Sequence, residues 1–500
     1  MDLDQRISTG VPNLDSLVEG GIPRGFTVMV AGNSGTGKTI LGSQFLYTGL
    51  TTEPKESGVY ISFSESKSQF YATSKKLGMD FQKFEDQDGF IYLDFVSLAN
   101  DGIQDAFEEI LAAIRSINAK RIVLDSFSAP SMSFTNRIES RITVQVFLGK
   151  IMRSEGITTL IISEIPYGST DLGNGIEESV ADAVIKLEHG PDNASPIFLK
   201  VLKMRGTAIN REKHVCSITS KGLTLYPKQR IEMNFPTSEK RVSSGIVNLD
   251  EKIDGKGLIE GTLSAIIGAS GSGKSTFAFQ FIAEGVRKHN ESGIFCSLED
   301  SEEEIKRIGK GFGYHMNELV SNARQEADEK GVDIRERGVE KEQQRAKLCI
   351  LSYNHVEYNP DAFIASLEEK IKEKRPKRLV IDGLSIYEHR YKDDLHDITE
   401  RISSLVRKYQ ITTLITLLGA QKNIFQVTEL NLSPLFHNVI LLRFVELYGR
   451  MKRIMMILKV SMSHQDGAIL EFMITKDKGL EIVGPIGDDY TGIFSGIARK

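Results

Sequence analysis

The stretch GNSGTGKT occupies Gly32–Thr39, and a second version of it, GASGSGKS, occupies Gly268–Ser275. Both satisfy the pattern G-x-x-x-x-G-K-[ST], whose glycines let successive backbone N–H groups surround a phosphate. The lysine of this pattern reaches the β- and γ-phosphates, and the final hydroxyl binds Mg²⁺. Each copy lies between a strand-like apolar run and a stretch that suits a helix facing the anion. The sequence therefore predicts two nucleoside triphosphate sites. Their residues are Gly32, Asn33, Ser34, Gly35, Thr36, Gly37, Lys38, Thr39, Gly268, Ala269, Ser270, Gly271, Ser272, Gly273, Lys274 and Ser275.

The two loops belong to a longer internal repeat. The segment ISTGVPNLD at Ile7–Asp15 is echoed by VSSGIVNLD at Val242–Asp250, ahead of the second loop. A chain of 500 residues exceeds one ordinary hydrophobic core, so the repeat predicts duplication into two α/β domains. We expect a first domain at 1–227, a polar linker at 228–240, a second domain at 241–485 and a short tail at 486–500.

Composition limits the partners of the chain. The formal net charge of −5 supplies no overall attraction for nucleic acid or anionic lipid. The three cysteines, Cys216, Cys296 and Cys349, form no C-x-x-C pair, which favours a reducing compartment over a zinc site. The opening residues MDLDQRISTG contain no apolar stretch typical of a leader, and no apolar run approaches membrane-spanning length. We expect a cytoplasmic chain with no membrane or nucleic-acid partner.

A buried-strand run that ends in aspartate follows each loop. The runs RIVLD at Arg121–Asp125 and RLVID at Arg378–Asp382 are typical of a parallel strand covered on both faces. An aspartate at the carboxyl end of such a strand lies beside the phosphate loop and can hold the Mg²⁺ shell. Alone, it could equally open a turn, but its occurrence in both repeats favours the metal role. The expected Mg²⁺ ligands are Thr39, Asp125, Ser275 and Asp382.

A further strand between these motifs ends in acidic residues. Residues 58–66 read GVYISFSES and residues 293–301 read GIFCSLEDS. A carboxylate at the mouth of a parallel sheet can deprotonate an attacking water or hydroxyl. The candidate catalytic acids are Glu65 in the first repeat and Glu299 and Asp300 in the second. The second repeat also carries extra charged residues near 321–344, which suit either a solvated excursion or a contact surface.

At this point the chain resembles the KaiC family, the two-domain RecA-like ATPases and autokinases of the cyanobacterial clock and their archaeal and bacterial relatives. The resemblance rests on the STG-x-x-x-LD opening, the GGIPRG lead-in at 20–25, both phosphate loops and the order of the later motifs. It implies an α/β fold made of tandem RecA-like P-loop domains, each with a mostly parallel sheet flanked by helices. It also implies ATP and Mg²⁺ as cofactors and a homo-oligomer, a hexamer, with ATP bound between subunits.

Three segments depart from the family pattern. The family base is the first of two acids, and the first repeat has Ser64 there. The family's K-x-R-G segment reaches the neighbouring subunit's γ-phosphate, which assigns that role to Lys203 and Arg205 and, in the second repeat, to Lys459. The arginine position of the second repeat is Ser461. The autophosphorylation segment keeps Ser433 as the candidate phosphoacceptor, but Pro434 replaces the adjacent threonine. The sequence ends before the longer regulator-binding tail of the clock proteins, so we expect no carry-over of that control.

The function that the sequence favours is a KaiC-like ATPase that binds ATP twice, hydrolyses it slowly and acts as a nucleotide-dependent signalling assembly. Three alternatives stay open: an autokinase that phosphorylates Ser433, a non-catalytic nucleotide sensor or scaffold, and a DNA-dependent RecA-like motor. The altered Ser64, Ser461 and Pro434 support the sensor. A DNA-dependent motor is disfavoured, because the sequence shows no N-terminal DNA-binding module and no basic, glycine-rich loop after the strand that ends in aspartate. The sequence does not identify a regulatory protein partner.

Overall fold

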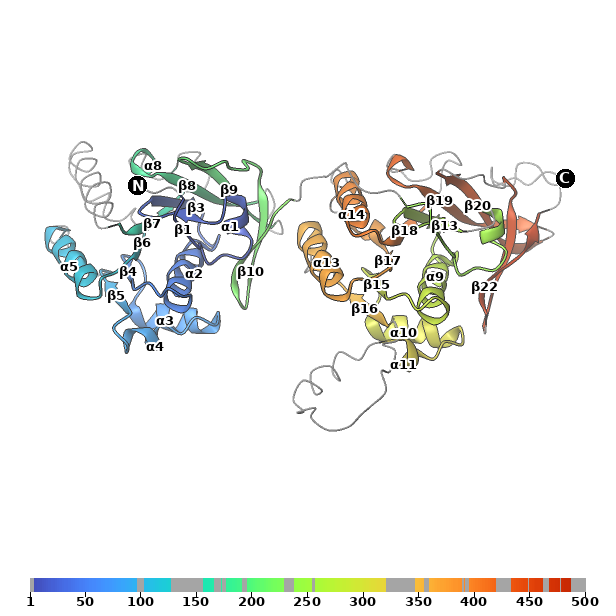
Figure 1. The fold of residues 1–500 in the computed structure, drawn as a ribbon, viewed down its shortest axis with the longest axis horizontal. Coiled ribbons are helices and arrows are strands. Elements are labelled where there is room, and N and C mark those ends of the chain that lie inside the picture. Colours follow the sequence, from blue (N-terminus) through green and yellow to red (C-terminus); the bar gives the residue numbers. More distant parts are fainter. Residues whose placement is uncertain are drawn as a thin grey trace. The chain divides into compact units, whose positions relative to one another are not determined.

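The computed structural model divides the chain into two compact units, Met1–Lys228 and Gln229–Lys500 (Figure 1). It describes residues 4–96, 103–126, 156–165, 172, 177–190, 196–228, 238–253, 257–320, 347–354, 359–388, 391, 395–419, 433–447, 449–461, 467–476 and 478–486. The charged insertion at 321–344 and the tail after 486 lie outside the described residues, as does most of the expected linker.

The first unit is built on a nine-stranded sheet with the order β11-β10-β9-β8-β3-β7-β6-β4-β5. Six strands are parallel: β3 (Thr27–Gly32), β4 (Gly58–Ser62), β5 (Phe90–Asp94), β6 (Arg121–Asp125), β7 (Thr158–Glu164) and β8 (Ala183–His189). Three antiparallel strands extend it: β9 (Ile197–Met204), β10 (His214–Thr219) and β11 (Gly222–Tyr226). A short β1–β2 pair (Arg6–Ile7 and Ile22–Pro23) lies before it. The helices are α1 (Leu14–Leu17), α2 (Lys38–Thr51), α3 (Lys67–Lys76), α4 (Gln82–Glu85), α5 (Ile103–Ser116) and α8 (Glu177–Val180).

The second unit repeats this arrangement strand for strand, in the order β16-β15-β17-β18-β14-β19-β20-β21-β22. Its parallel strands are β14 (Leu263–Gly268), β15 (Gly293–Ser297), β16 (Leu348–Ser352), β17 (Arg378–Asp382), β18 (Thr412–Leu418) and β19 (Asn438–Leu447). Its antiparallel strands are β20 (Arg450–Val460), β21 (Leu470–Thr475) and β22 (Gly479–Pro485). A short β12–β13 pair (Arg241–Val242 and Leu258–Ile259) lies before it.

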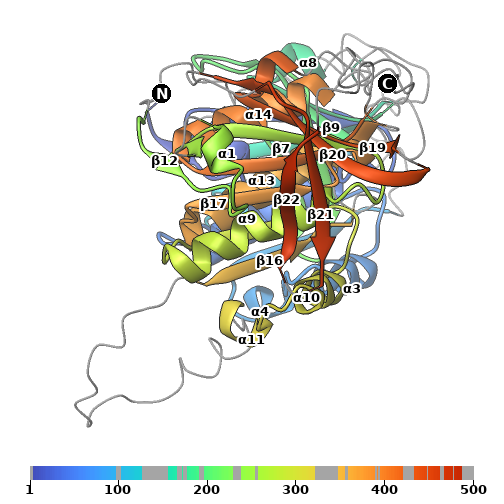
Figure 2. The same ribbon diagram turned by 90° about the vertical axis from the view of Figure 1, so that its right-hand side faces the viewer.

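The helices of the second unit cover both faces of its sheet (Figure 1). They are α9 (Lys274–Lys288), α10 (Glu302–Gly311), α11 (Met316–Leu319), α13 (Pro360–Lys374) and α14 (Leu395–Tyr409). One buried cluster joins α9 to the sheet, and another joins α13 and α14 to it. Figure 2 shows β21 and β22 beside α9. The predicted fold class, two tandem α/β domains with mostly parallel sheets, is confirmed.

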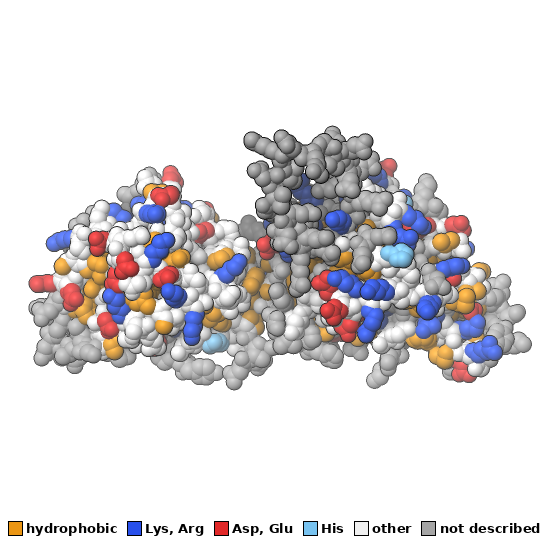
Figure 3. Space-filling model, turned by 90° about the horizontal axis from the view of Figure 1, so that it is seen from below, with side chains coloured by type: hydrophobic (Ala, Val, Ile, Leu, Met, Phe, Trp, Pro, Cys, Tyr) orange, Lys and Arg blue, Asp and Glu red, His pale blue; other side chains and the backbone are white. Residues whose placement is uncertain are grey.

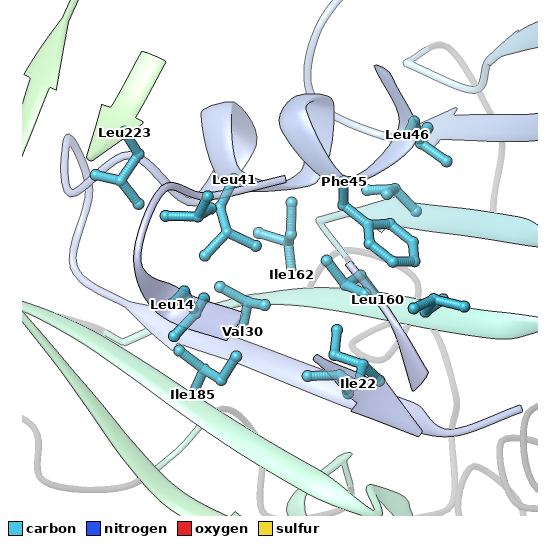
Figure 4. Close-up of a cluster of buried hydrophobic side chains, with 14 of the residues drawn as sticks. Leu14, Ile22, Val30, Leu41, Phe45, Leu46, Leu160, Ile162, Ile185 and Leu223 are labelled. Carbon is cyan, nitrogen blue, oxygen red and sulfur yellow. The ribbon is translucent and has the colours of Figure 1, made fainter. Parts of the chain in front are cut away.

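The first core lies between α2 and the sheet (Figure 4). Leu41 and Phe45 of α2 pack over Val30, Leu160 and Ile162, and all five side chains are at most 1% exposed. Strands covered on both faces are buried throughout, which explains their continuous apolar runs. On the face shown in Figure 3, acidic and basic side chains are interspersed on each unit.

The aspartate of the repeated opening motif is a structural residue. Asp15 accepts hydrogen bonds from the Ser8 hydroxyl at 2.6 Å and from the Thr9 backbone N–H at 2.9 Å. Asp250 accepts the equivalent bonds from Ser243 and Ser244, at 2.7 and 2.9 Å. The shared STG-x-x-x-LD spacing therefore fixes the loop that enters each domain.

A buried arginine ties three elements of each unit together. Arg121, at the start of β6, donates to Glu56 at 2.7 Å and to the carbonyl oxygens of Ser8 and Phe45. Arg378, at the start of β17, makes the same set of bonds. Its partners are Glu291 and the carbonyl oxygens of Ser243 and Phe281. The phosphate-loop helix is thereby held against the strand that ends in the metal-binding aspartate candidate.

Candidate functional site

The backbone of each phosphate loop places a helix N-terminus at the end of a central strand. In the second unit the loop joins β14 to α9, and its Gly273 is the helix N-cap with φ 108°. In the first unit Gly37 is the N-cap of α2 with φ 89°. Side chains with a Cβ atom rarely adopt these conformations, so the glycines of the motif are required by the turn. The free N–H groups at such a helix start form an anion site.

The loop lysines point back into their own loops. Lys38 donates to the Asn33 carbonyl oxygen at 2.8 Å, and Lys274 donates to that of Ala269 at 2.9 Å. Burial lowers the pKa of Lys274, while the charges of Asp382 and Glu299 act in the opposite direction. A phosphate is a stronger acceptor for an ammonium group than a neutral carbonyl oxygen. Both lysines therefore suit a nucleotide's phosphates.

Each loop hydroxyl contacts the aspartate predicted from the strand pattern. The Thr39 hydroxyl donates to Asp125 at 2.7 Å, and Ser275 donates to Asp382. Burial raises the pKa of both aspartates, because a charged carboxylate loses hydration there. A cation beside them would offset that cost.

These oxygen atoms fit Mg²⁺. Hydroxyl and carboxylate oxygens are the ligands it prefers, and it commonly keeps phosphate and water in its remaining positions. Within the described ranges, no group of three or more His, Cys, Asp or Glu side chains could hold a metal by itself. The protein ligands would be one hydroxyl and one aspartate in each unit.

Two residues that hold the aspartates were not predicted from the sequence. Asp125 also accepts from the Tyr60 hydroxyl of β4 at 2.6 Å, whereas Asp382 accepts from Thr416 of β18. The two units thus support the same aspartate from different strands. The sequence signal was a polar residue, Tyr60 or Thr416, within an otherwise apolar strand run. The sequence did not indicate which side chain that residue would contact.

A cavity of about 220 Å³ opens at the second loop. It is lined by Lys274, Ser275, Asp382 and Glu299, together with Leu418 and Ile474. Gly383 lies directly against Glu299, since a Cβ atom there would come within 2.7 Å of its Cγ. Asp300 is not one of the lining residues, and its backbone N–H donates to the Ser297 hydroxyl. Glu299 therefore lines the loop cavity, and the charge of Asp300 acts on Asp382.

In the first unit Glu65, which aligns with Asp300, lies close to Asp125. Burial raises the pKa of Glu65, and the charge of Asp125 raises it further. Its backbone carbonyl oxygen accepts from the Tyr92 hydroxyl at 2.6 Å, which fixes the turn after β4.

A second acid of the first unit, Glu164, was missed in the sequence. It ends β7, beside Gly32 of the phosphate loop in the parallel register. Burial lowers the pKa of Lys38, and the charge of Glu164 opposes that shift. The same charge adds to the rise that burial causes in the pKa of Asp125, whereas the hydrogen bonds from Tyr60 and Thr39 lower it. Leu418 occupies the matching register in the second unit. The signal was the acid that ends the run TTLIISE, because carboxyl ends of parallel strands meet at one edge.

The candidate trans-acting cations lie at the end of β9 in the first unit. Arg205 pairs with Asp182 at 3.0 Å, with 56% of the arginine side chain exposed and only 3% of the aspartate. Lys203 donates to the Ala181 carbonyl oxygen at 2.7 Å. Both side chains are held within their own unit, and the Arg205 head is accessible.

The second unit replaces both members of the Arg205–Asp182 pair. In the strand register, His437 stands where Asp182 does and Ser461 where Arg205 does. Ser461 donates to the His437 carbonyl oxygen at 2.9 Å, and Lys459 donates to that of Phe436 at 2.7 Å. Burial and the nearby charges of Arg407 and Lys459 lower the pKa of His437 to about 4. The loss of the arginine is therefore matched by loss of its buried partner.

The candidate phosphoacceptor Ser433 begins a short 3₁₀ turn, Ser433–Leu435, ahead of β19. Nothing further is described of its side chain.

Comparison with known proteins gives a consistent result across both units. A family model described as "ATPase: KaiC" matches residues 7–230 and 242–486. The chain belongs to the KaiC ATPase family. It is 28% identical to the circadian clock protein KaiC3 of Synechocystis sp., over 98% of this chain and 94% of that protein. It is 27% identical to the circadian clock oscillator protein KaiC of Thermostichus vulcanus, over 99% and 92%, and 26% identical to that of Synechococcus elongatus, over 95% and 89%.

The family fixes the coarse activity as that of an ATPase with duplicated, nucleotide-binding domains. Among the described residues, no helix is both long enough and apolar enough to cross a membrane.

Proposed function

We propose that this KaiC-family chain hydrolyses ATP slowly, with Mg²⁺, at two unequal sites, and acts as a nucleotide-dependent regulatory assembly. The observation that carries this proposal is the second-unit cavity, where the loop lysine, the hydroxyl–aspartate pair and a carboxylate converge. Each of these groups has a separate task in phosphoryl transfer to water.

At the second site, Lys274 binds the β- and γ-phosphates, and Ser275 and Asp382 hold the metal. Bound Mg²⁺ would supply charge neutralisation on the phosphates. Glu299 lines the same cavity, so its carboxylate can orient a water molecule and accept its proton. Asp300 does not line the cavity, and we assign it no part in proton transfer.

At the first site, Ser64 stands at the usual position of the base, so other acids must orient the water. Glu65 and Glu164 approach from neighbouring parts of the sheet edge, and the charges of both act on Asp125 or Lys38. We assign proton acceptance to Glu65 and electrostatic positioning of Lys38 to Glu164. A base outside the usual position is expected to work more slowly.

The assembly that we propose is a homo-oligomer, a hexamer as the family resemblance implies. Lys203 and Arg205 would act on the ATP of a neighbouring first unit, and Lys459 on that of a neighbouring second unit. Cations supplied in trans stabilise charge on the transferred phosphoryl group, which couples turnover to assembly. The exposed head of Arg205 supports this role. Because Ser461 replaces the arginine, the second unit would supply one cation fewer to its neighbour than the first unit does.

The regulatory role follows from slow, assembly-dependent turnover. Two relatives are named as circadian clock proteins. For this chain we propose only the broader role, that of a signalling protein. An autokinase acting on Ser433 is the second candidate, weakened because Pro434 has no hydroxyl and removes one acceptor.

The test of this proposal is a parallel measurement of phosphate release and of covalent phosphate. The purified chain is incubated with Mg²⁺ and labelled ATP, and its intact mass is then determined. We expect phosphate release without a mass increase. Stoichiometric phosphate on Ser433 would favour the autokinase, and absence of both signals would favour the non-catalytic sensor.

A further inference from the structure

A second cavity of the second unit lies away from the nucleotide site. Its volume is about 520 Å³, within the range of small-molecule pockets, roughly 300–1,000 Å³. It is formed where α13 and α14 end and where β17 and β18 begin. Its lining residues are Ile371, Lys372, Arg375, Pro376, Lys377, Tyr409 and Ile411. The phosphate loop lies at the carboxyl ends of these parallel strands, whereas this cavity lies at their amino ends.

In the part of the chain that the structure describes, two cations of this cavity have no anionic partner. Lys372 pairs with Glu368 at 3.4 Å. The side chains of Arg375 and Lys377, in contrast, form no ion pair or hydrogen bond with another residue in the described part of the chain. Cations in the last turn of a helix are stabilised by the free carbonyl groups there, which explains why they occur without an acidic partner. Lys377 lies beyond the end of α13 at Lys374, so that explanation does not cover it.

The remaining wall is apolar and its aromatic ring is fixed. Ile371 and Ile411 are each 1% exposed, and Pro376 is buried. The Tyr409 hydroxyl donates to Glu368 at 2.9 Å, which anchors the ring at the side of the cavity. A ring held in place by its hydroxyl presents a flat face at little entropic cost on binding. The cavity thus combines the half-buried ring of Tyr409 with two exposed cations that have no ion-pair partner among the described residues.

The first unit provides an internal comparison. Asn118 stands where Arg375 does, in the same left-handed conformation, with φ 48° and 45° respectively. Glu155 of the first repeat aligns with Tyr409 of the second, because each lies two residues before the isoleucine that precedes a strand, Ile157 or Ile411. In the sequence, one cation and the aromatic residue are therefore particular to the second repeat.

We propose that this cavity binds a small organic anion, a phosphate or carboxylate carried on a flat apolar body. Arg375 and Lys377 would donate to the anionic group, and the body would lie against the half-buried ring of Tyr409. Charge-assisted hydrogen bonds supply the polar part of the affinity and stacking on the ring supplies the rest. This site is separate from ATP binding and does not rest on the proposed hydrolysis.

The sequence contains no tryptophan, so Tyr409→Trp places a single fluorescent reporter in the cavity. Phenyl phosphate is titrated into the full-length variant with Mg²⁺ and saturating ATP, which keeps the phosphate loops occupied. We expect a saturable change in emission with phenyl phosphate and little response to phenol, the neutral analogue, or to inorganic phosphate alone. Adding Arg375→Asn, the first unit's residue, should weaken binding by about tenfold or more, because a charge-assisted contact is lost.

Calorimetry of phenyl phosphate with the unsubstituted chain, and with Arg375→Asn or Lys377→Ala alone, tests the site without the reporter. Weaker binding by both variants, with two nucleotides per chain retained, supports the proposal. The proposal is overturned if phenyl phosphate shows no saturable binding, if phenol binds equally well, or if both variants bind like the unsubstituted chain.

Discussion

The two acids that follow β15 are adjacent in the chain, yet only one faces the cavity. Glu299→Gln keeps the size of the side chain but removes its basicity. In a Lys38→Ala background, which silences the first site, we expect phosphate release to fall on the order of 10²–10⁴-fold while ATP stays bound.

Asp300→Asn in the same background is the matched control. Because Asp300 does not line the cavity, its turnover should stay close to that of the parent. Steady-state phosphate release measures both variants. Equal losses in the two would contradict the assignment of Glu299.

The first site divides its work between two acids. In a Lys274→Ala background, Glu65→Gln should abolish most turnover with little effect on ATP affinity, since it removes the proton acceptor. Glu164→Gln should instead change ATP affinity as well as rate, because its charge acts on Lys38. Binding titrations and phosphate release together distinguish the roles. Unchanged turnover in both variants would show that neither acid takes part.

Much of the site could be predicted at the residue scale because its motifs are local in sequence. The loop lysines, hydroxyls and aspartates all follow from short patterns placed at strand ends. Tyr60 and Glu164 could not be assigned in this way, because their partners lie on other strands. Only the strand order brings such residues to one edge, and that order is a long-range property.

At the element scale, the phosphate-loop helix depends on a close approach to the neighbouring strand. A Cβ atom at Gly285 in α9 would lie 2.3 Å from Nε of the buried Arg378. We expect Gly285→Ala to destabilise the second unit by about 1–3 kcal/mol, the usual cost of overpacking. Urea unfolding of the full chain measures the change.

The control for this substitution is Gly311→Ala at the end of α10, where no heavy atom lies within 4 Å of the added Cβ. Stability there should be unchanged or increase by up to about 1 kcal/mol. If Gly285→Ala proved as stable as Gly311→Ala, the arginine contact would not restrict α9.

The strand and helix elements themselves were predictable, since each phosphate loop joined a continuous apolar run to a helix. The antiparallel extension β20 to β22 was less so, because its strands mix buried, half-buried and exposed residues. The packing of Gln280 against the Leu480 backbone, which docks the extension on α9, joins residues distant in sequence.

At the scale of the whole molecule, assembly should depend on ATP. If Lys203 and Arg205 complete a neighbour's site, ATP stabilises the oligomer by mass action. Light scattering should show a larger particle with a non-hydrolysable ATP analogue than after nucleotide removal. The double variant Lys203→Ala, Arg205→Ser should lose this difference, whereas Lys76→Ala, an exposed cation of α3, should keep it. A monomer under both conditions would contradict the trans-acting role.

Duplication of the ATPase domain implies two nucleotide sites in one chain, and the bound nucleotide can be counted. The chain is loaded with Mg²⁺ and ATP, freed of excess nucleotide and denatured, and the released nucleotide is quantified by chromatography. We expect two nucleotides per chain, and one each in Lys38→Ala and Lys274→Ala, because each lysine serves a separate loop. A stoichiometry of one in the unsubstituted chain, or two in either variant, would contradict this expectation.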